Sequence, residues 1–403
     1  MEARFENLLK VIGLQKYSHS GRLGQIPPYL FAEIGRKIEA ARKAGVDMIS
    51  FGIGDPDMPT PAHVVEELGR ASRDPRNHQY PDYEGLLAFR EAVASWYKRR
   101  HNVSLDPVSE VLALIGSKEG SLHLSLAFVN PGDYALVPNP CYTPYRTGTI
   151  LANGLVHDLP LLEENGFLPQ LGKIPKEVVK KAKVLYLSYP NNPTGAVAGM
   201  EFYREVVDFA NDNGLIVCSD NPYSEIAFDG YRPLSFLEVP GAKDVGVEFN
   251  SLSKPYNMTG WRVGMAVGNP EIISAMATVK NNVDSGVFNA IQYAAIAALL
   301  RTPDSEIGRL NSVYQKRRDL VWETLNSVGI RTGRPKATFY MWCRVPERHT
   351  SASFATLLLE KAGVVVTSGA AYGRYGEGFF RMSLTVPDAR LAEAMGRIKD
   401  ALA

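Results

Sequence analysis

Six short and almost continuously apolar runs recur along the middle of this chain of 403 residues, and each one ends in a polar or glycine-containing cluster. The runs are VLALIGS (111–117), YALVPNP (134–140), KVLYLSYP (183–190), GLIVCSD (214–220), VGVEFNSLSK (245–254) and RVGMAVG (262–268). Continuous apolar character is typical of strands that are buried on both faces. Helical patterns separate the runs, as at 84–100 and 201–213. This alternation predicts an α/β fold with a largely parallel sheet.

The length of the chain and the change of pattern along it predict two domains, because 403 residues exceed what one compact core usually holds. Residues 29–44 carry apolar residues at helical spacing, and 48–61 predict a strand that enters a turn. Beyond 295, long helices lead into three further apolar runs at 336–345, 361–369 and 378–386, which predict a smaller α+β domain. The expected division is an arm at 1–27, a first part of the small domain at 28–60, the large domain at 61–294 and the rest of the small domain at 295–403.

The overall composition argues against several classes of partner. Lys plus Arg numbers 44 and Asp plus Glu 43, so no charge excess favours binding to nucleic acid or to an anionic membrane. The 3 cysteines are far apart and the 7 histidines lack metal-ligand spacing, so we expect neither a disulfide framework nor a metal site. The N-terminal residues do not resemble a signal peptide, and no apolar stretch approaches about 18 residues, so we expect a cytoplasmic protein.

Polar side chains concentrate where four of the apolar runs end. The clusters are GSKEG (116–120), NNPTG (191–195), SDNPY (219–223) and SLSK (251–254). The carboxyl ends of parallel strands meet at one edge of the sheet, where ligands of open α/β sheets bind. A lysine, an aspartate, a tyrosine, an asparagine and several hydroxyls are therefore expected to lie together at that edge.

These residue types match the requirements of pyridoxal phosphate. The aldehyde of that cofactor needs an amine, and its pyridine nitrogen needs a carboxylate that keeps it protonated. The phenolate oxygen accepts a hydrogen bond, and the phosphate favours hydroxyls, a cation and backbone N–H groups at the start of a helix. The chain offers these groups in the order Ser117, Lys118, Asn192, Asp220, Tyr223, Ser251, Ser253, Lys254 and Arg262. The sequence therefore predicts a site for this cofactor.

Each of these residues has a simpler explanation when it is taken alone. Lys254 could be a surface lysine, Asp220 could be a turn residue, and the NNPTG segment (191–195) could be only a turn. The hydroxyls that flank Lys254, and the four apolar residues before Asp220, favour the functional interpretation. Arg381 stands in the apolar run GFFRMSL, where a guanidinium is costly to bury unless it meets an anion. For Arg381 we therefore favour a carboxylate ligand over a structural ion pair.

Six motifs, in order and at the right spacing, give the chain a resemblance to a known family. They are FGIGDPD (51–57), QYPDYEG (79–85), YPNNPTG (189–195), SDNPY (219–223), SLSKPYNMTGWRVG (251–264) and FFRMSL (379–384). On these motifs the chain resembles the fold-type I aminotransferases of classes I and II over essentially its whole length. The resemblance implies a large pyridoxal-phosphate-binding domain with a mostly parallel, seven-stranded sheet, and a smaller α+β domain. It also implies amino acid and 2-oxo acid substrates and a homodimer with shared active sites.

The resemblance implies a role for the residue at each matching position. Lys254 would hold the cofactor as a Schiff base and move the proton between the substrate Cα and the cofactor carbon. Asp220 would pair with the pyridinium nitrogen, Tyr223 and Asn192 would contact the phenolate oxygen, and Tyr142 would stack on the ring. The phosphate would be held by Ser117, Lys118, Ser251, Ser253, Arg262 and, from the other subunit, Tyr80.

Within the family, the chain is most similar to the LL-diaminopimelate aminotransferases. The stretches that carry this similarity are PPYLFAEI (27–34), GIGDPDMPTP (52–61), GSKEG (116–120), EFNSLSKPYNMTGWR (248–262) and NNVDSGVFNAIQ (281–292). Arg381 would bind the substrate α-carboxylate bidentately, with Gly54 and Asn192 closing around it. Some members carry a Glu that binds the distal ammonium of diaminopimelate. At the corresponding position this chain has Tyr83, with Glu84 beside it. Further substrate contacts would come from Tyr29, Lys118, Tyr142 and, across the subunit interface, Asn289.

The sequence leaves three functions open. The first is amino transfer to 2-oxoglutarate, either from LL-diaminopimelate in lysine biosynthesis or from aspartate or alanine in an enzyme of broad specificity. The second is a pyridoxal-phosphate lyase or decarboxylase, such as a carbon–sulfur β-lyase, which needs the same lysine, aspartate and arginine. The third is a non-catalytic binding protein, which the complete set of cofactor-binding groups disfavours. The first two differ in which Cα bond lies perpendicular to the cofactor ring and in what happens after that bond breaks, and the sequence determines neither.

Overall fold

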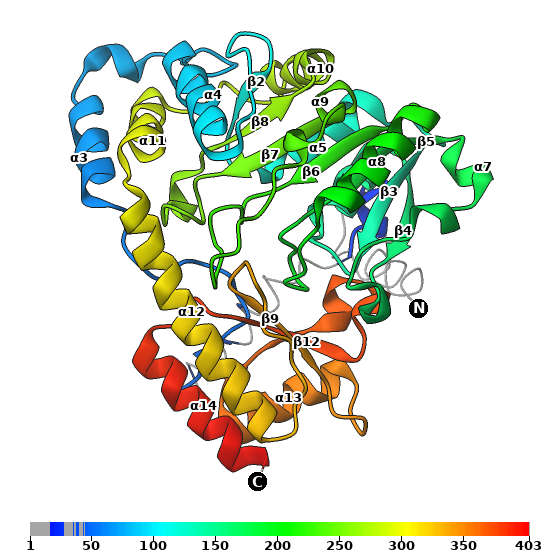
Figure 1. Ribbon diagram of the computed structural model, residues 1–403, viewed down its shortest axis with the longest axis vertical. Coiled ribbons are helices and arrows are strands. Elements are labelled where there is room, and N and C mark those ends of the chain that lie inside the picture. Colours follow the sequence, from blue (N-terminus) through cyan, green and yellow to red (C-terminus); the bar gives the residue numbers. More distant parts are fainter. Residues whose placement is uncertain (1–16, 28–34, 36–37, 40–42, 44, 403) are drawn as a thin grey trace.

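A seven-stranded sheet forms the centre of the larger part of the molecule (Figure 1). The computed structural model describes residues 17–27, 35, 38–39, 43 and 45–402. The strand order is β2-β8-β7-β6-β5-β3-β4, in which β8 runs antiparallel to both of its neighbours and all other pairs are parallel. The strands are β2 (Val111–Leu114), β3 (Tyr134–Asn139), β4 (Leu155–Pro160), β5 (Ala182–Leu187), β6 (Ile216–Asp220), β7 (Gly246–Ser251) and β8 (Gly264–Gly268). The expected α/β fold with a mostly parallel, seven-stranded sheet is confirmed.

Alternate side chains of the strands face two separate apolar cores. In β5, Val184 and Tyr186 belong to one core, and Leu185 and Leu187 belong to the other. Burial on both faces explains why the runs are apolar throughout. The first core is completed by α5 (Lys118–Phe128), α6 (Pro144–Leu151) and α10 (Pro270–Asn281). The second is completed by α3 (Ala62–Ala71), α4 (Leu87–His101), α7 (Lys176–Val179), α8 (Met200–Asn213), α9 (Ala242–Val245) and α11 (Asn289–Arg301).

All six apolar runs contain strands of this sheet, but the sequence analysis missed β4. This strand lies at the edge of the sheet and pairs with β3 alone. Several of its side chains, including His157 and Asp158, are only partly buried. An edge strand can carry polar residues because water reaches it, and its sequence then lacks the continuous apolar pattern of the inner strands.

The C-terminal elements form a smaller unit in the lower part of Figure 1. Its antiparallel sheet has the order β11-β12-β9, and β1 pairs in parallel with β10. Ile49 and Phe51 lie in the same apolar core as the C-terminal elements. The elements are β1 (Ile49–Ser50), α12 (Asp304–Ser327), β9 (Tyr340–Arg344), α13 (Ser351–Ala362), β10 (Val364–Val365), β11 (Thr367–Ser368), β12 (Phe379–Ser383) and α14 (Asp388–Leu402).

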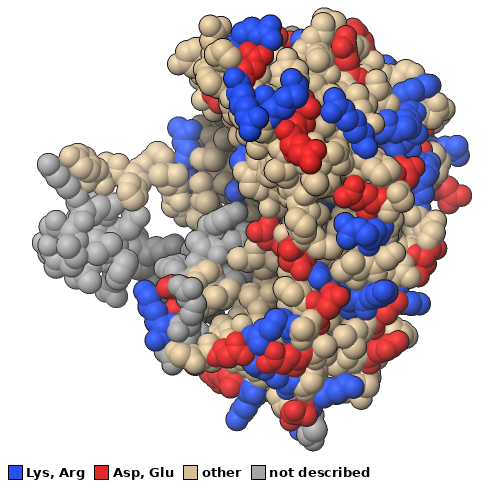
Figure 2. Space-filling view, turned by 90° about the vertical axis from the view of Figure 1, so that its left-hand side faces the viewer, with Lys and Arg blue, Asp and Glu red and all other residues tan. Residues whose placement is uncertain are grey.

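Some sequence predictions about organisation are not tested by the structure. The domain boundaries at 61 and 295 stay predictions. Most of the expected helix at 29–44, and residues 1–16 of the expected arm, lie outside the described residues. On the face seen in Figure 2, acidic and basic side chains are interspersed, in keeping with the near-neutral composition. No helix in the described part of the chain is long and apolar enough to cross a membrane.

Candidate active site

The carboxyl ends of β2, β5, β6 and β7 open onto a cavity of about 300 Å³. Tyr340 of β9 and residues 53–55, which follow β1, contribute to it from the small unit. The strand-end clusters thus meet at one edge of the sheet, as the sequence pattern predicts. The predicted site residues that line the cavity are Gly54, Ser117, Lys118, Tyr142, Asn192, Asp220, Tyr223, Ser251, Ser253, Lys254 and Arg262.

The amine of Lys254 is part of this cavity, just beyond the end of β7. Its Nζ donates a hydrogen bond to the backbone oxygen of Gly54 at 2.8 Å. Burial lowers the pKa of this amine to about 8; Asp55 opposes the shift, while the charges of Arg381 and Arg262 add to it. A lowered pKa raises the fraction of neutral amine at neutral pH, which is the nucleophilic form. Lys254 is therefore suited to react with an aldehyde.

The carboxylate of Asp220 ends β6 and is buried at the bottom of the cavity. Its Oδ2 accepts a hydrogen bond from the hydroxyl of Tyr145 at 2.5 Å. Its Oδ1 has no hydrogen-bond partner among the described residues. Burial raises the pKa of this carboxyl to about 7, although the Tyr145 hydrogen bond lowers it. A buried carboxylate with a vacant acceptor is stabilised by a cationic N–H donor, and a protonated pyridine nitrogen is such a donor.

The turn between β2 and α5, residues 115–118, offers an anion-binding site, and we call it the anion-binding turn. The turn leads into the N-terminal end of α5, where the helix dipole is positive and favours an anion. Gly116 has a φ of +75°, and a Cβ at this position would lie 2.2 Å from Nη2 of Arg262. A glycine is therefore needed for the guanidinium to approach the turn. Helix start, cation and nearby hydroxyls are the combination that a phosphate favours.

The NNPTG segment is both a turn and part of the site, so the two interpretations of its sequence hold together. Oδ1 of Asn191 accepts hydrogen bonds from the backbone N–H of Thr194 at 3.0 Å and from its hydroxyl at 2.8 Å. Asn192 instead lines the cavity, and its Oδ1 accepts a hydrogen bond from Arg381 at 2.7 Å. The first asparagine holds the turn, and the second is thereby placed to contact a ligand.

Arg381 lies in β12 with 0% of its surface exposed. Its Nη2 donates to the backbone oxygen of Gly52 at 2.8 Å, in addition to the bond from Nη1 to Asn192. The guanidinium carbon also lies 4.1 Å from the ring centroid of Tyr340 and 5.0 Å from that of Tyr372. These contacts fix the plane of the guanidinium, and a fixed plane is what bidentate recognition of a carboxylate requires.

Some predicted residues do not reach the cavity of their own chain. Tyr80 is 82% exposed, Tyr83 is 43% exposed, and Asn289 is buried at the start of α11 without lining the cavity. Oε2 of Glu84 lies 3.7 Å from Nη1 of Arg90, and Glu84 does not line the cavity either. Tyr29 lies outside the described residues.

Two further tyrosines line the site and were missed by the sequence analysis. Tyr145 bonds Asp220 and stacks on Tyr186, with ring centroids 5.1 Å apart. Tyr145 lies in the first turn of α6, and Tyr142 precedes that helix, with the two ring centroids 5.9 Å apart. The second tyrosine three residues after Tyr142 was the available signal in the sequence. The hydroxyl of Tyr340 lies 3.1 Å from that of Tyr223. No local pattern indicates Tyr340, because its contribution depends on how the small unit meets the sheet.

Comparisons with known proteins agree with this geometry. Residues 46–398 match the model of the family "aminotransferase class I and II". A relative named LL-diaminopimelate aminotransferase, from Moorella thermoacetica, is 56% identical over 94% of this chain and 97% of its own. Another of that name, from Aquifex aeolicus, is 53% identical over 95% of this chain and 99% of its own. The solved structure of apo-BacF from Bacillus subtilis is 38% identical, with a TM-score of 0.92 over 96% of this chain and 99% of that one.

This chain belongs to the class I and II aminotransferases, which are pyridoxal-phosphate-dependent enzymes. The residues present fit that cofactor. Lys254 offers the amine, the unsatisfied Oδ1 of Asp220 offers an acceptor for a ring N–H, and the anion-binding turn with Arg262 offers a phosphate site.

Proposed function

We propose that this enzyme is an LL-diaminopimelate aminotransferase. It moves an amino group from LL-diaminopimelate to 2-oxoglutarate, which gives tetrahydrodipicolinate after cyclisation, and glutamate, as a step of lysine biosynthesis. The observation that carries this proposal is that relatives of that name are 50–56% identical over 94–95% of the chain. The cavity supports the same reaction class, because it joins a reactive amine, a buried carboxylate and an anion-binding turn.

The roles of the lining residues follow from their chemistry. Bound pyridoxal phosphate supplies an electron-withdrawing ring that stabilises negative charge at the substrate Cα. Lys254 would hold the cofactor through its amine, and the same amine would accept the proton from Cα. Asp220 would keep the ring nitrogen protonated, Tyr223 and Asn192 would hydrogen bond to the ring oxygen, and Tyr142 would pack on the ring. The phosphate would be held by Ser117, Lys118, Ser251, Ser253 and Arg262.

The substrate is held at both ends. Arg381 binds the α-carboxylate, with Gly54 and Asn192 around it. The distal end of LL-diaminopimelate carries a carboxylate and an ammonium, whereas glutamate carries only a carboxylate, so both must be accepted when water is excluded. Adaptable donors suit this task, and we assign it to Tyr29, Lys118, Tyr142 and Asn289. Glu84 is the candidate acid for the distal ammonium, from its place beside Tyr83.

With 2-oxoglutarate as acceptor, we expect LL-diaminopimelate to be the preferred donor among LL-diaminopimelate, aspartate, alanine and glutamate. The measurement is kcat/KM for the half-reaction of the yellow holoenzyme, followed as loss of its cofactor absorbance and reversed by 2-oxoglutarate. A general aminotransferase would replace this assignment if alanine or aspartate reacted about tenfold better, which corresponds to about 1.4 kcal/mol. Consumption of the amino acid with no lasting loss of absorbance would indicate the lyase alternative, because a lyase ends each turnover with the cofactor in its aldehyde form.

Arg381→Lys is expected to lower kcat/KM for every amino acid and oxo acid by a similar factor, about 10- to 100-fold. A guanidinium forms two parallel hydrogen bonds with a carboxylate, which an ammonium cannot reproduce, and a hydrogen bond to a charged group contributes about 1.5–3 kcal/mol. Steady-state kinetics with each substrate, together with cofactor content, measure this. An effect on one substrate alone would instead mean that Arg381 binds the side chain of that substrate and not the shared α-carboxylate.

The active unit is proposed to be a homodimer that works in the cytoplasm. Tyr80 and Asn289 motivate the dimer, because both are expected to contact ligand and neither lines the cavity of its own chain. Against the described part of the chain Tyr80 is 82% exposed, and a second copy would give it a site to enter.

A further inference from the structure

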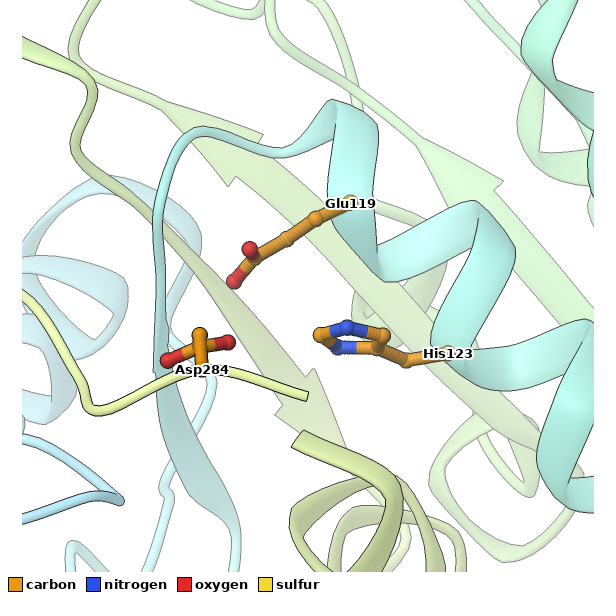
Figure 3. A group of neighbouring side chains, drawn as sticks. All are labelled: Glu119, His123 and Asp284. Carbon is orange, nitrogen blue, oxygen red and sulfur yellow. The ribbon is translucent and has the colours of Figure 1, made fainter. Parts of the chain in front are cut away.

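Glu119, His123 and Asp284 point toward one another beside the anion-binding turn (Figure 3). The first two come from α5, and Asp284 comes from the loop that follows α10. Their ligand atoms all lie within 4.8 Å of one another, a spacing that would suit a metal ion. However, Nζ of Lys280 lies 3.2 Å from Oε1 of Glu119 and 2.7 Å from Oδ1 of Asp284. The group therefore already contains its own cation, and a metal ion would have to displace it.

Lys280 is buried as deeply as a charged residue can be, with 0% of its surface exposed. A buried ammonium is stable only when it is paired, and two carboxylates surround this one. Burial lowers the pKa of His123, and the charge of Lys280 lowers it further. His123 is thus neutral at neutral pH, and the positive charge of the group belongs to Lys280. The two carboxylates are held at fixed positions by one ammonium.

The first carboxylate, that of Glu119, is hydrogen bonded to the cofactor site of the same chain. Oε1 of Glu119 accepts a hydrogen bond from the backbone N–H of Ile115 at 2.7 Å. Ile115 begins the anion-binding turn, and its carbonyl oxygen accepts a bond from Arg262 at 3.5 Å. Lys280 therefore acts on the turn through a single intermediate side chain.

The second carboxylate, that of Asp284, is connected to a different part of the molecule. Oδ1 of Asp284 accepts a hydrogen bond from the backbone N–H of Gly286 at 2.7 Å. Gly286 has a φ of +89° and lies against residues 81–83. Together with Tyr80, which precedes them, we call these residues the tyrosine segment. A Cβ at Gly286 would lie 2.9 Å from Cγ of Pro81 and 3.2 Å from the backbone oxygen of Asp82. The backbone at Gly286 therefore packs too closely against the tyrosine segment for any side chain to fit between them. A shift of Gly286 would consequently shift the tyrosine segment as well.

We propose that Lys280 is a positioning residue that ties the anion-binding turn of its own site to the tyrosine segment, which serves the site of a second copy of the chain. This inference rests on the proposed function in one respect, namely that Tyr80 acts across a dimer. One buried ammonium then sets the geometry of a phosphate site in its own subunit and of a phenol that enters the neighbouring subunit. Loss of the ammonium leaves two carboxylates facing each other, so both connections relax together.

Hybrid dimers separate the two connections. In hybrid A, one subunit carries Lys280→Met and the other Lys254→Ala, so the lysine-bearing site combines the altered turn with a normal tyrosine segment. In hybrid B, one subunit carries both changes and the other is unaltered, so the lysine-bearing site combines a normal turn with the altered segment. The reference hybrid pairs Lys254→Ala with the unaltered chain. The readout is the amount of cofactor fixed to Lys254 by borohydride, as a function of pyridoxal phosphate concentration.

We expect both hybrids to need at least about fivefold more cofactor for half-maximal fixation than the reference hybrid, since residues in one ionic network are energetically coupled. Lys243→Met is the matched control, because it removes a lysine from an ion pair with Glu110 that is partly exposed. That change should leave the midpoint unaltered. A shift in hybrid A alone would reduce Lys280 to a local support of the turn, and no shift in either hybrid would reject the proposal.

Two single-connection variants keep the proposal testable if Lys280→Met does not fold. Glu119→Gln should shift the midpoint only in the arrangement of hybrid A, and Asp284→Asn only in that of hybrid B. A merely structural loss of stability would affect both arrangements with either variant. Tyr80→Phe in the Lys254→Ala subunit tests the dimer assumption separately, since it should weaken fixation in the unaltered subunit. No amino donor enters these measurements, so they are independent of the LL-diaminopimelate assignment.

Discussion

Lys254→Ala is expected to lower kcat by at least about 10⁴-fold, while the protein remains folded and still binds pyridoxal phosphate through its anion-binding turn. The change removes the amine that holds the cofactor and the group that carries the Cα proton. Positioned proton transfer alone contributes about 10²- to 10⁴-fold, and the loss of covalent attachment adds to this. Steady-state turnover and single-turnover rates of the half-reaction measure the effect.

The unaltered protein provides the control for this assignment. Borohydride reduction of the holoenzyme followed by peptide mapping should place the pyridoxyl group on Lys254, and a label on Lys118, the other lysine that lines the cavity, would contradict it. In cofactor-free protein, Lys254 should react with pyridoxal, which lacks the phosphate, with a pH midpoint near 8. An ordinary lysine has a pKa of about 10.4. The pKa is lowered because burial disfavours the charged amine, so the neutral amine is present at lower pH than in an ordinary lysine.

The inner part of the fold was predictable because burial on both faces leaves a direct mark on the sequence. For this reason residues 184–187 of one strand and 216–218 of the next are continuously apolar. The edge strand at 155–160 was not predictable in this way, because most of its side chains are only partly buried. Its polar residues therefore interrupt the continuous apolar pattern from which the other strands were predicted.

The candidate site was predictable to the extent that its residues follow strands. Asp220 and Lys254 belong to the polar clusters that follow apolar runs, and the mostly parallel sheet brings them to one edge. Tyr340 stands within a strand of the small unit, so its place in the cavity depends on tertiary packing that no local pattern encodes. Lys280 reads as an ordinary lysine at the end of a helix, and only the meeting of α5 with the loop after α10 places it between two carboxylates.

The second large effect is expected for Asp220→Asn, which should lower the rate of the proton-transfer step by about 10²- to 10³-fold with cofactor content unchanged. This is the loss seen when one preorganised electrostatic partner of a transition state is removed. The amide keeps the shape of the side chain and can still accept a hydrogen bond from Tyr145, so the change isolates the charge. Without a cation beside it, the buried carboxyl has a pKa of about 7. A protonated ring nitrogen against the vacant Oδ1 favours the ionised form and lowers that pKa, so the carboxylate and the ring stay charged together at neutral pH.

The measurement is the single-turnover rate of the half-reaction with donor that carries deuterium at Cα. Asp220→Asn should enlarge the isotope effect, because proton transfer becomes more completely rate-limiting as its barrier rises. Tyr145→Phe is the matched comparison: it removes the hydrogen bond to Oδ2 but retains the charge, and its effect should be smaller than that of Asp220→Asn. Near-normal turnover of Asp220→Asn with full cofactor content would mean that the ring nitrogen does not depend on this carboxylate. The buried charge at the end of β6 would then need another explanation.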